Sequence, residues 1–128
     1  LLVCTPPGSH LEGILFGLAA GLCVICEKPL VTTLGDLDAI EAACAAAPGF
    51  LYPSHNYLSA PSVQALLGIV SDRRRSASPL SGHLRTLRVG HARGVQEWRP
   101  DWRRDRPISG GGIIQDHGPH SFYLASAF

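Results

Sequence analysis

Three short apolar segments alternate with two helix-like segments in the first part of the chain. The apolar segments are residues 1–4, 22–26 and 50–53. Between them, residues 10–20 have a helical pattern, and a second helix opens at Thr32 or Thr33 and is broken by Pro48-Gly49. Strand, helix, strand, helix, strand with brief connections predicts a parallel sheet with right-handed crossovers. The fold class is therefore α/β.

Each predicted strand is followed by polar or proline-containing residues. These are Thr5-Pro6-Pro7, Glu27-Lys28-Pro29 and Ser54-His55-Asn56. In a parallel sheet the carboxyl ends of the strands lie on one edge, where open α/β sheets bind ligands. Lys28 is the only lysine in the chain. It follows a segment that suits a strand buried on both faces, and Pro29 restricts its backbone. We therefore expect a ligand site at this edge.

The second half of the chain carries fewer signals. Residues 60–72 have a helical pattern, residues 73–81 indicate a loop or boundary, and residues 84–89 alternate as in a half-buried strand of a second layer. Asp116 and His120 are four residues apart, so on a helix they share one face. The glycine run 110–112 just before them allows the backbone to approach a ligand closely.

Composition excludes several classes of protein. The chain has 128 residues and a net charge of +1, which argues against a nucleic-acid-binding surface. Its longest apolar run, residues 13–26, is too short to span a membrane. The four cysteines lie in strand-like or helical segments, which are ordinary places for buried, reduced thiols. A reducing, cytoplasmic setting without disulfides is expected.

Four motifs together resemble the Gfo/Idh/MocA family, which includes glucose–fructose oxidoreductase and inositol dehydrogenase. They are Thr5-Pro6 with His10, Cys26-Glu27-Lys28-Pro29, His55-Asn56, and the glycine run with Asp116, Gly118 and His120. The resemblance covers nearly the whole chain. It implies that residues 1–58 are part of a Rossmann dinucleotide-binding domain. Residues 59–128 would contain the linking helix and the start of an α/β substrate domain built on an open antiparallel sheet.

The resemblance also implies a reaction. The protein would be an NAD(P)-dependent oxidoreductase acting on a sugar, cyclitol or related small molecule, with Lys28 at the reacting hydroxyl, His120 as general acid/base and Asp116 orienting the pair. Hydride removal leaves an oxygen that must lose its proton, and histidine can accept it near neutral pH. The residues that the resemblance places at the NAD or NADP cofactor are Thr5, Pro6, His10, Glu27, Lys28, Pro29 and Asn56. No metal is expected.

The resemblance places a glycine-rich dinucleotide fingerprint before Leu1, so the chain is expected to be a piece of a longer, homo-oligomeric protein and to be inactive alone. Three alternatives stay open. The first is a non-catalytic binding or structural descendant of the same fold. The second is a metal-dependent enzyme using Asp116 and His120, with His117 and His55 as further ligands. The third is a thiol redox centre at Cys23 and Cys26.

Overall fold

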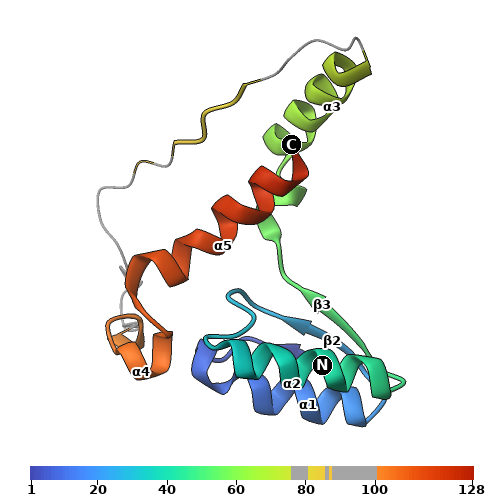
Figure 1. The fold of residues 1–128 in the computed structure, drawn as a ribbon, viewed down its shortest axis with the longest axis vertical. Helices are drawn as coiled ribbons and strands as arrows, with labels where there is room; N and C mark the ends of the chain where they lie inside the picture. The colour runs from blue at the N-terminus through green and yellow to red at the C-terminus, as the bar shows by residue number, and fades with distance from the viewer. Residues whose placement is uncertain (76–80, 86, 88–100) are drawn as a thin grey trace.

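The computed structural model describes residues 1–75, 81–85, 87 and 101–128 of the chain. A three-stranded parallel sheet of order β1-β2-β3 forms its first part (Figure 1). The strands are β1 (Leu2–Val3), β2 (Cys23–Cys26) and β3 (Phe50–Pro53). The connecting helices are α1 (His10–Ala19) and α2 (Leu34–Ala46). The predicted α/β fold with a parallel sheet is confirmed, although β1 is shorter than the apolar segment suggested.

Local sequence signals explain where these helices begin and end. The hydroxyl of Thr33 accepts a hydrogen bond of 3.1 Å from the backbone N–H of Asp36, which caps α2 at its first turn. Gly21, with φ of 69°, follows the end of α1 in the left-handed conformation that glycine adopts readily. Inside α1, a Cβ on Gly17 would lie 2.5 Å from a methyl of Val24, so glycine there lets the helix pack closely on the sheet.

The core lies between one face of the sheet and the two helices. Its buried residues are Val3, Ile14, Leu18, Val24, Cys26 and Ile40. The strand residues on the other face, Leu2, Ile25 and Tyr52, pair with one another across the sheet and are 67%, 41% and 52% exposed. The prediction that the second strand is buried on both faces is therefore wrong, because the helices of the described residues cover only one face of the sheet.

The cysteines also differ from expectation. All four are free, but only Cys26 is buried. Cys4, Cys23 and Cys44 are exposed. Cys23 follows the alternation of β2 and lies on the uncovered face of the sheet, whereas Cys44 lies on the outer side of α2. The predicted burial of these three thiols is wrong for the same reason as that of β2, since burial requires a second covering layer.

Beyond β3 the regular elements of the described residues are all helices, whereas residues 81–85 and 87 have no regular secondary structure. The elements are η2 (Asn56–Ser59), α3 (Pro61–Arg75), η3 (Asp101–Arg103), α4 (Arg106–Ser109) and α5 (Gly112–Ala127). The helix predicted at residues 60–72 is present and continues to Arg75. Of the strand predicted at residues 84–89, residues 84, 85 and 87 have no strand conformation and the others lie outside the described residues. Every strand in the described ranges belongs to the parallel sheet.

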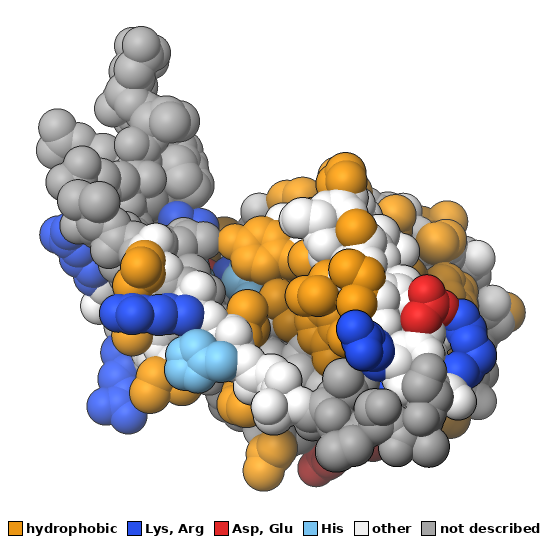
Figure 2. Space-filling model, turned by 90° about the horizontal axis from the view of Figure 1, so that it is seen from above, with side chains coloured by type: hydrophobic (Ala, Val, Ile, Leu, Met, Phe, Trp, Pro, Cys, Tyr) orange, Lys and Arg blue, Asp and Glu red, His pale blue; other side chains and the backbone are white. Residues whose placement is uncertain are grey.

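Helix α5 extends from the edge of the sheet to α3. Its first turns lie near the loop after β2, and its C-terminal end reaches α3 (Figure 1). Seen from the end where α3 lies, the surface carries grouped hydrophobic side chains beside several basic side chains (Figure 2). Residues of α3 and α5 are among the exposed hydrophobic ones, including Leu66, Ile69 and Phe122.

Candidate active site at the carboxyl edge of the sheet

The glycine run brings the start of α5 against the loop that follows β2. Gly110 has φ of 78°, and a Cβ at this position would lie 2.6 Å from both Cβ and Cγ2 of Thr32. A few residues later, the side-chain amide of Gln115 donates to the carbonyl of Val31 at 3.4 Å. The close approach that the glycines allow is thus made by Gly110 to Thr32, and no bound ligand is needed to explain it. Glycine at position 110 fixes where α5 begins.

This placement joins Lys28 to Asp116. The Lys28 ammonium donates to Oδ1 of Asp116 at 2.6 Å and to its backbone carbonyl, also at 2.6 Å. Both side chains are largely buried, at 15% and 18% exposure. Two residues 88 positions apart in the sequence therefore meet at the sheet edge. The double contact holds Lys28 in one position, with its charge balanced by a carboxylate.

Asp116 is surrounded by basic side chains. Arg103 lies 3.7 Å and His117 lies 3.8 Å from its second carboxylate oxygen. Burial alone would raise the pKa of Asp116, but the hydrogen bond and charge of Lys28, with Arg103 and His117, lower it below its ordinary value. The carboxyl group is therefore ionised at neutral pH.

His120 lies one turn further along α5 and belongs to an aromatic cluster. Its ring is 8% exposed and stacks on Tyr57 with centroids 4.2 Å apart. Nδ1 of His120 lies 2.6 Å from the hydroxyl of Tyr123, whose ring stacks on His55 at 4.4 Å. The same hydroxyl accepts from the backbone N–H of Tyr57 at 3.2 Å and lies 3.5 Å from Oδ1 of Asn56. This cluster attaches α5 to the segment after β3.

His10 occupies the interior behind the edge. It is 1% exposed, with Nδ1 3.0 Å from the carbonyl oxygen of Pro29 and Nε2 2.8 Å from that of Thr5. Its ring therefore links the residues that follow β1 to those that follow β2. Among the other predicted cofactor contacts, Pro29 is buried, Pro6 is half-buried, and Thr5, Glu27 and Asn56 are exposed at the edge.

Comparison with known proteins identifies the family. Residues 1–55 match the family model GFO_IDH_MocA, an oxidoreductase family with an NAD-binding Rossmann fold. The chain is 32% identical over 118 residues to a 1,5-anhydro-D-fructose reductase from Ensifer adhaerens, covering 92% of this chain and 34% of that protein. Residues 1–55 therefore match the NAD-binding Rossmann domain of the Gfo/Idh/MocA family. The resemblance that the motifs indicated is confirmed.

Solved structures agree with this assignment. GenD2 from gentamicin A biosynthesis, solved in complex with NAD, is 25% identical with a TM-score of 0.74, over 98% of this chain and 34% of that one. An inositol dehydrogenase homolog complexed with NAD+ from Azotobacter vinelandii is 23% identical, with a TM-score of 0.71 over 98% and 33% of the two chains, and shows the same fold. The chain spans about a third of the length of these proteins.

Of the predicted catalytic residues, Lys28 and Asp116 meet directly. His120 is on the same helix but contacts the cluster after β3. Sequence reasoning missed Tyr57 and Tyr123, both of which touch His120. Tyr123 is three residues after His120, so the helical period would place it on the same face. The stacking of Tyr57 on His120 had no such signal, because it joins two segments that are distant in sequence.

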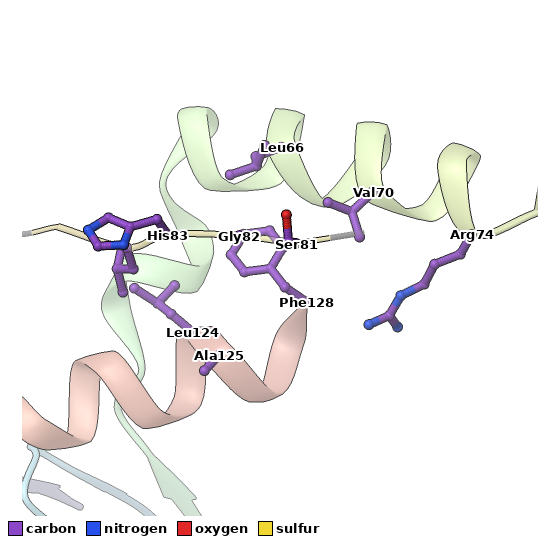
Figure 3. A pocket seen from close by; sticks show the side chains of 10 residues that line it. Leu66, Val70, Arg74, Ser81, Gly82, His83, Leu124, Ala125 and Phe128 are labelled. Carbon is purple, nitrogen blue, oxygen red and sulfur yellow. The ribbon is translucent and has the colours of Figure 1, made fainter. Parts of the chain in front are cut away.

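Two cavities lie beside α5. One of about 560 Å³ opens next to His120. It is lined by Tyr57, Ala60, Ser62, Val63, Leu84, Ile113, His117, His120, Ser121 and Leu124. The other, of about 500 Å³, lies between α3 and α5 and contains none of the predicted site residues (Figure 3). Both volumes are in the usual range for small-molecule sites, but only the first adjoins the candidate acid/base.

The alternative chemistries find little support in the described residues. Within residues 1–75, 81–85, 87 and 101–128, no three His, Cys, Asp or Glu side chains are grouped to hold a metal ion. Cys23 and Cys26 point to opposite faces of β2, one exposed and one buried. Burial, assisted by the negative charges of Glu27 and Cys4, raises the pKa of the Cys26 thiol to about 12. A thiol redox centre at this pair is therefore wrong.

No helix in the described part of the chain is both long enough and apolar enough to serve as a membrane span.

Proposed function

We propose that the complete protein is an oxidoreductase that transfers hydride between NAD(P) and a hydroxyl or carbonyl group of a sugar, cyclitol or related small molecule. The family match and the similarity to a 1,5-anhydro-D-fructose reductase support the reaction class and a sugar-like substrate. The observation that carries the proposal is the contact of Lys28 with Asp116, since it brings the end of β2 to the helix that bears His120.

The cofactor would lie at the carboxyl edge of the sheet. Thr5, Glu27 and Asn56 are exposed there and offer hydroxyl, carboxylate and amide groups suited to the polar parts of a dinucleotide. His10 and Pro29 are buried, so we assign them the support of this edge from behind. The nicotinamide supplies the hydride chemistry when bound, while the protein orients the reactants. NAD is the first cofactor to test, because GenD2 was solved with it.

In this proposal, His120 and Lys28 act on the reacting hydroxyl group. His120 would take the proton of the substrate hydroxyl during oxidation and return it during reduction. The Lys28 ammonium would stabilise the negative charge that develops on the same oxygen. Asp116 would hold that ammonium in place through its 2.6 Å contact. The cavity next to His120, with Ser62, His117 and Ser121 among its lining residues, would hold the substrate.

The test uses the full-length protein. Binding of NAD and NADP is measured by fluorescence titration, and turnover of sugars, cyclitols and 1,5-anhydro-D-fructose is followed by nicotinamide absorbance. His120→Ala and Lys28→Ala should each lower kcat by roughly 100-fold or more, the usual contribution of such groups. His83→Ala is the matched control, because His83 lines the other cavity and should leave kcat unchanged.

The kinetic and binding measurements distinguish the possible outcomes. Turnover within about threefold of wild type in His120→Ala or Lys28→Ala would refute the role of that residue. Cofactor binding without turnover of any substrate would instead favour the non-catalytic descendant.

A further inference from the structure

The hydroxyl of Tyr123 lies at the centre of three polar atoms. Nδ1 of His120 is 2.6 Å away, the backbone nitrogen of Tyr57 is 3.2 Å away and Oδ1 of Asn56 is 3.5 Å away. These atoms come from α5 and from the segment after β3. A phenol hydroxyl has one hydrogen to donate and can accept others. The three contacts therefore restrict which nitrogen of His120 carries hydrogen.

Two of the three roles are fixed by chemistry. The backbone N–H of Tyr57 can only donate, so the Tyr123 oxygen accepts it. Oδ1 of Asn56 can only accept, so it takes the hydroxyl hydrogen of Tyr123. The Tyr123 oxygen can still accept a second hydrogen bond, and Nδ1 of His120 is placed to donate it. All three contacts are satisfied together when Nδ1 carries a hydrogen.

Tyr123 is suited to this role because it is a neutral phenol held by packing. Burial raises the pKa of Tyr123 above its ordinary value; the hydrogen bond from the backbone N–H of Tyr57 opposes this, and the charges of Tyr57 and Glu27 add to it. Its ring stacks on His55 with an interplanar angle of 17°, and the His120 ring stacks on Tyr57 with an angle of 15°. The two stacks fix the orientation of both rings at the hydrogen bond between them.

We propose that Tyr123 is a positioning residue that keeps the hydrogen of neutral His120 on Nδ1, so that Nε2 is the atom that exchanges a proton with the substrate. The catalytic consequence rests on the proposed function, whereas the tautomer itself does not. In the imidazolium form Nδ1–H would keep the same hydrogen bond, so that His120 gains and loses its proton without turning.

The tautomer is measured by ¹⁵N NMR of the full-length protein with labelled histidine. The resonances of His120 are assigned by their loss in His120→Gln. In the wild-type protein, above the pH at which His120 is protonated, hydrogen should reside on Nδ1. In Tyr123→Phe, which keeps the stacked ring and removes only the hydroxyl, the population should move toward the Nε2–H tautomer. Tyr52→Phe is the matched control, because Tyr52 lies on the exposed face of β3 and should leave the resonances unchanged.

A second variant tests the same arrangement of donors and acceptors by changing the acceptor of the Tyr123 hydrogen. Asn56→Ala removes the group that accepts the Tyr123 hydrogen, which frees that hydrogen for Nδ1. The His120 tautomer should again move toward Nε2–H, although the hydroxyl is still present. This variant is followed by NMR alone, because Asn56 is also a candidate cofactor contact.

Kinetics then connect the tautomer to turnover. Tyr123→Phe should lower kcat by roughly 10-fold, the effect of losing one good hydrogen bond, and leave KM within about twofold. The proposal would be overturned if the hydrogen of neutral His120 resided on Nε2 in the wild-type protein, or if wild type and both variants had the same tautomer. It would also be overturned if Tyr123→Phe left kcat unchanged while His120→Ala was inactive. If His120→Ala keeps full turnover but the tautomer behaves as described, the proposed function fails and the positioning by Tyr123 stands.

Discussion

Replacing Gly110 by alanine should disturb the junction that holds α5 at the sheet edge. Alanine in the left-handed conformation, which φ of 78° requires, costs about 1–2 kcal/mol. The added Cβ would also lie 2.6 Å from two carbon atoms of Thr32, and overpacking of this kind typically costs roughly 1–3 kcal/mol. Together these effects predict a loss of about 2–5 kcal/mol in the free energy of unfolding.

The same substitution should also disturb the candidate active site. Gly110 lies two residues before the start of α5, and Asp116 lies in the second turn of that helix. Relief of the overlap moves the start of α5 away from Thr32, which weakens the 2.6 Å contacts of Lys28 with Asp116. We therefore expect Gly110→Ala to lower kcat of the full-length protein by roughly 10-fold, because preorganisation of the charged pair is impaired.

Denaturant unfolding and steady-state kinetics measure the two effects. Gly68→Ala is the control: Gly68 is in the exposed middle of α3, no atom lies within 4 Å of an added Cβ, and the change should stabilise by about 0.5–1 kcal/mol. The reasoning is refuted if Gly110→Ala unfolds within about 0.5 kcal/mol of wild type with unchanged kcat. A large loss of stability with full activity would refute only the link between the junction and the site.

Two further predictions concern pH and thiol reactivity. Since the pKa of Asp116 is lowered in the folded state, its ionisation stabilises the protein above the ordinary pKa of 3.8, and this contribution is lost as pH falls through the lowered value. Unfolding measured between pH 7 and pH 3 should therefore show roughly 1 kcal/mol less acid sensitivity in Asp116→Asn, and equal sensitivity would contradict this. Iodoacetamide at about pH 8 should modify the three exposed cysteines of the native protein and spare Cys26, because that thiol is buried and its pKa is raised. Peptide mass spectrometry measures the labelling of each cysteine. Labelling of Cys26 at the same rate as the others would show that its thiol is accessible.

The parallel sheet was predictable because its signals are local. Thr33 marks the start of α2 with a side chain that caps the helix, and Gly21 marks the end of α1 with a backbone conformation that other residues avoid. The polar residues after each strand predicted a common edge, since parallel pairing alone places them there. These inferences depend on neighbours within a few positions, which a single sequence reveals.

The rest of the site depends on contacts between distant segments. Nothing near Gly110 in the sequence indicates that Thr32 is its neighbour, and nothing near Tyr57 indicates that its ring stacks on His120. The glycine run could be recognised as a place of close approach, but its partner could not be identified. Burial of β2 was overestimated because an apolar segment reports the preference of its side chains and not the presence of a second layer.

The distance between Asp116 and His120 along α5 is similar to the distance between the ends of neighbouring strands of the sheet. Four residues of α-helix advance by about 6 Å, and neighbouring strands lie about 4.8 Å apart. A helix that crosses the ends of β2 and β3 can therefore contact the loop after one strand with one residue and the segment after the next strand with a residue one turn later. Asp116 makes the first contact through Lys28, and His120 makes the second through Tyr57. One helix thus fixes the charged pair and the imidazole relative to each other, which is the arrangement that stabilising an oxyanion and moving its proton both require.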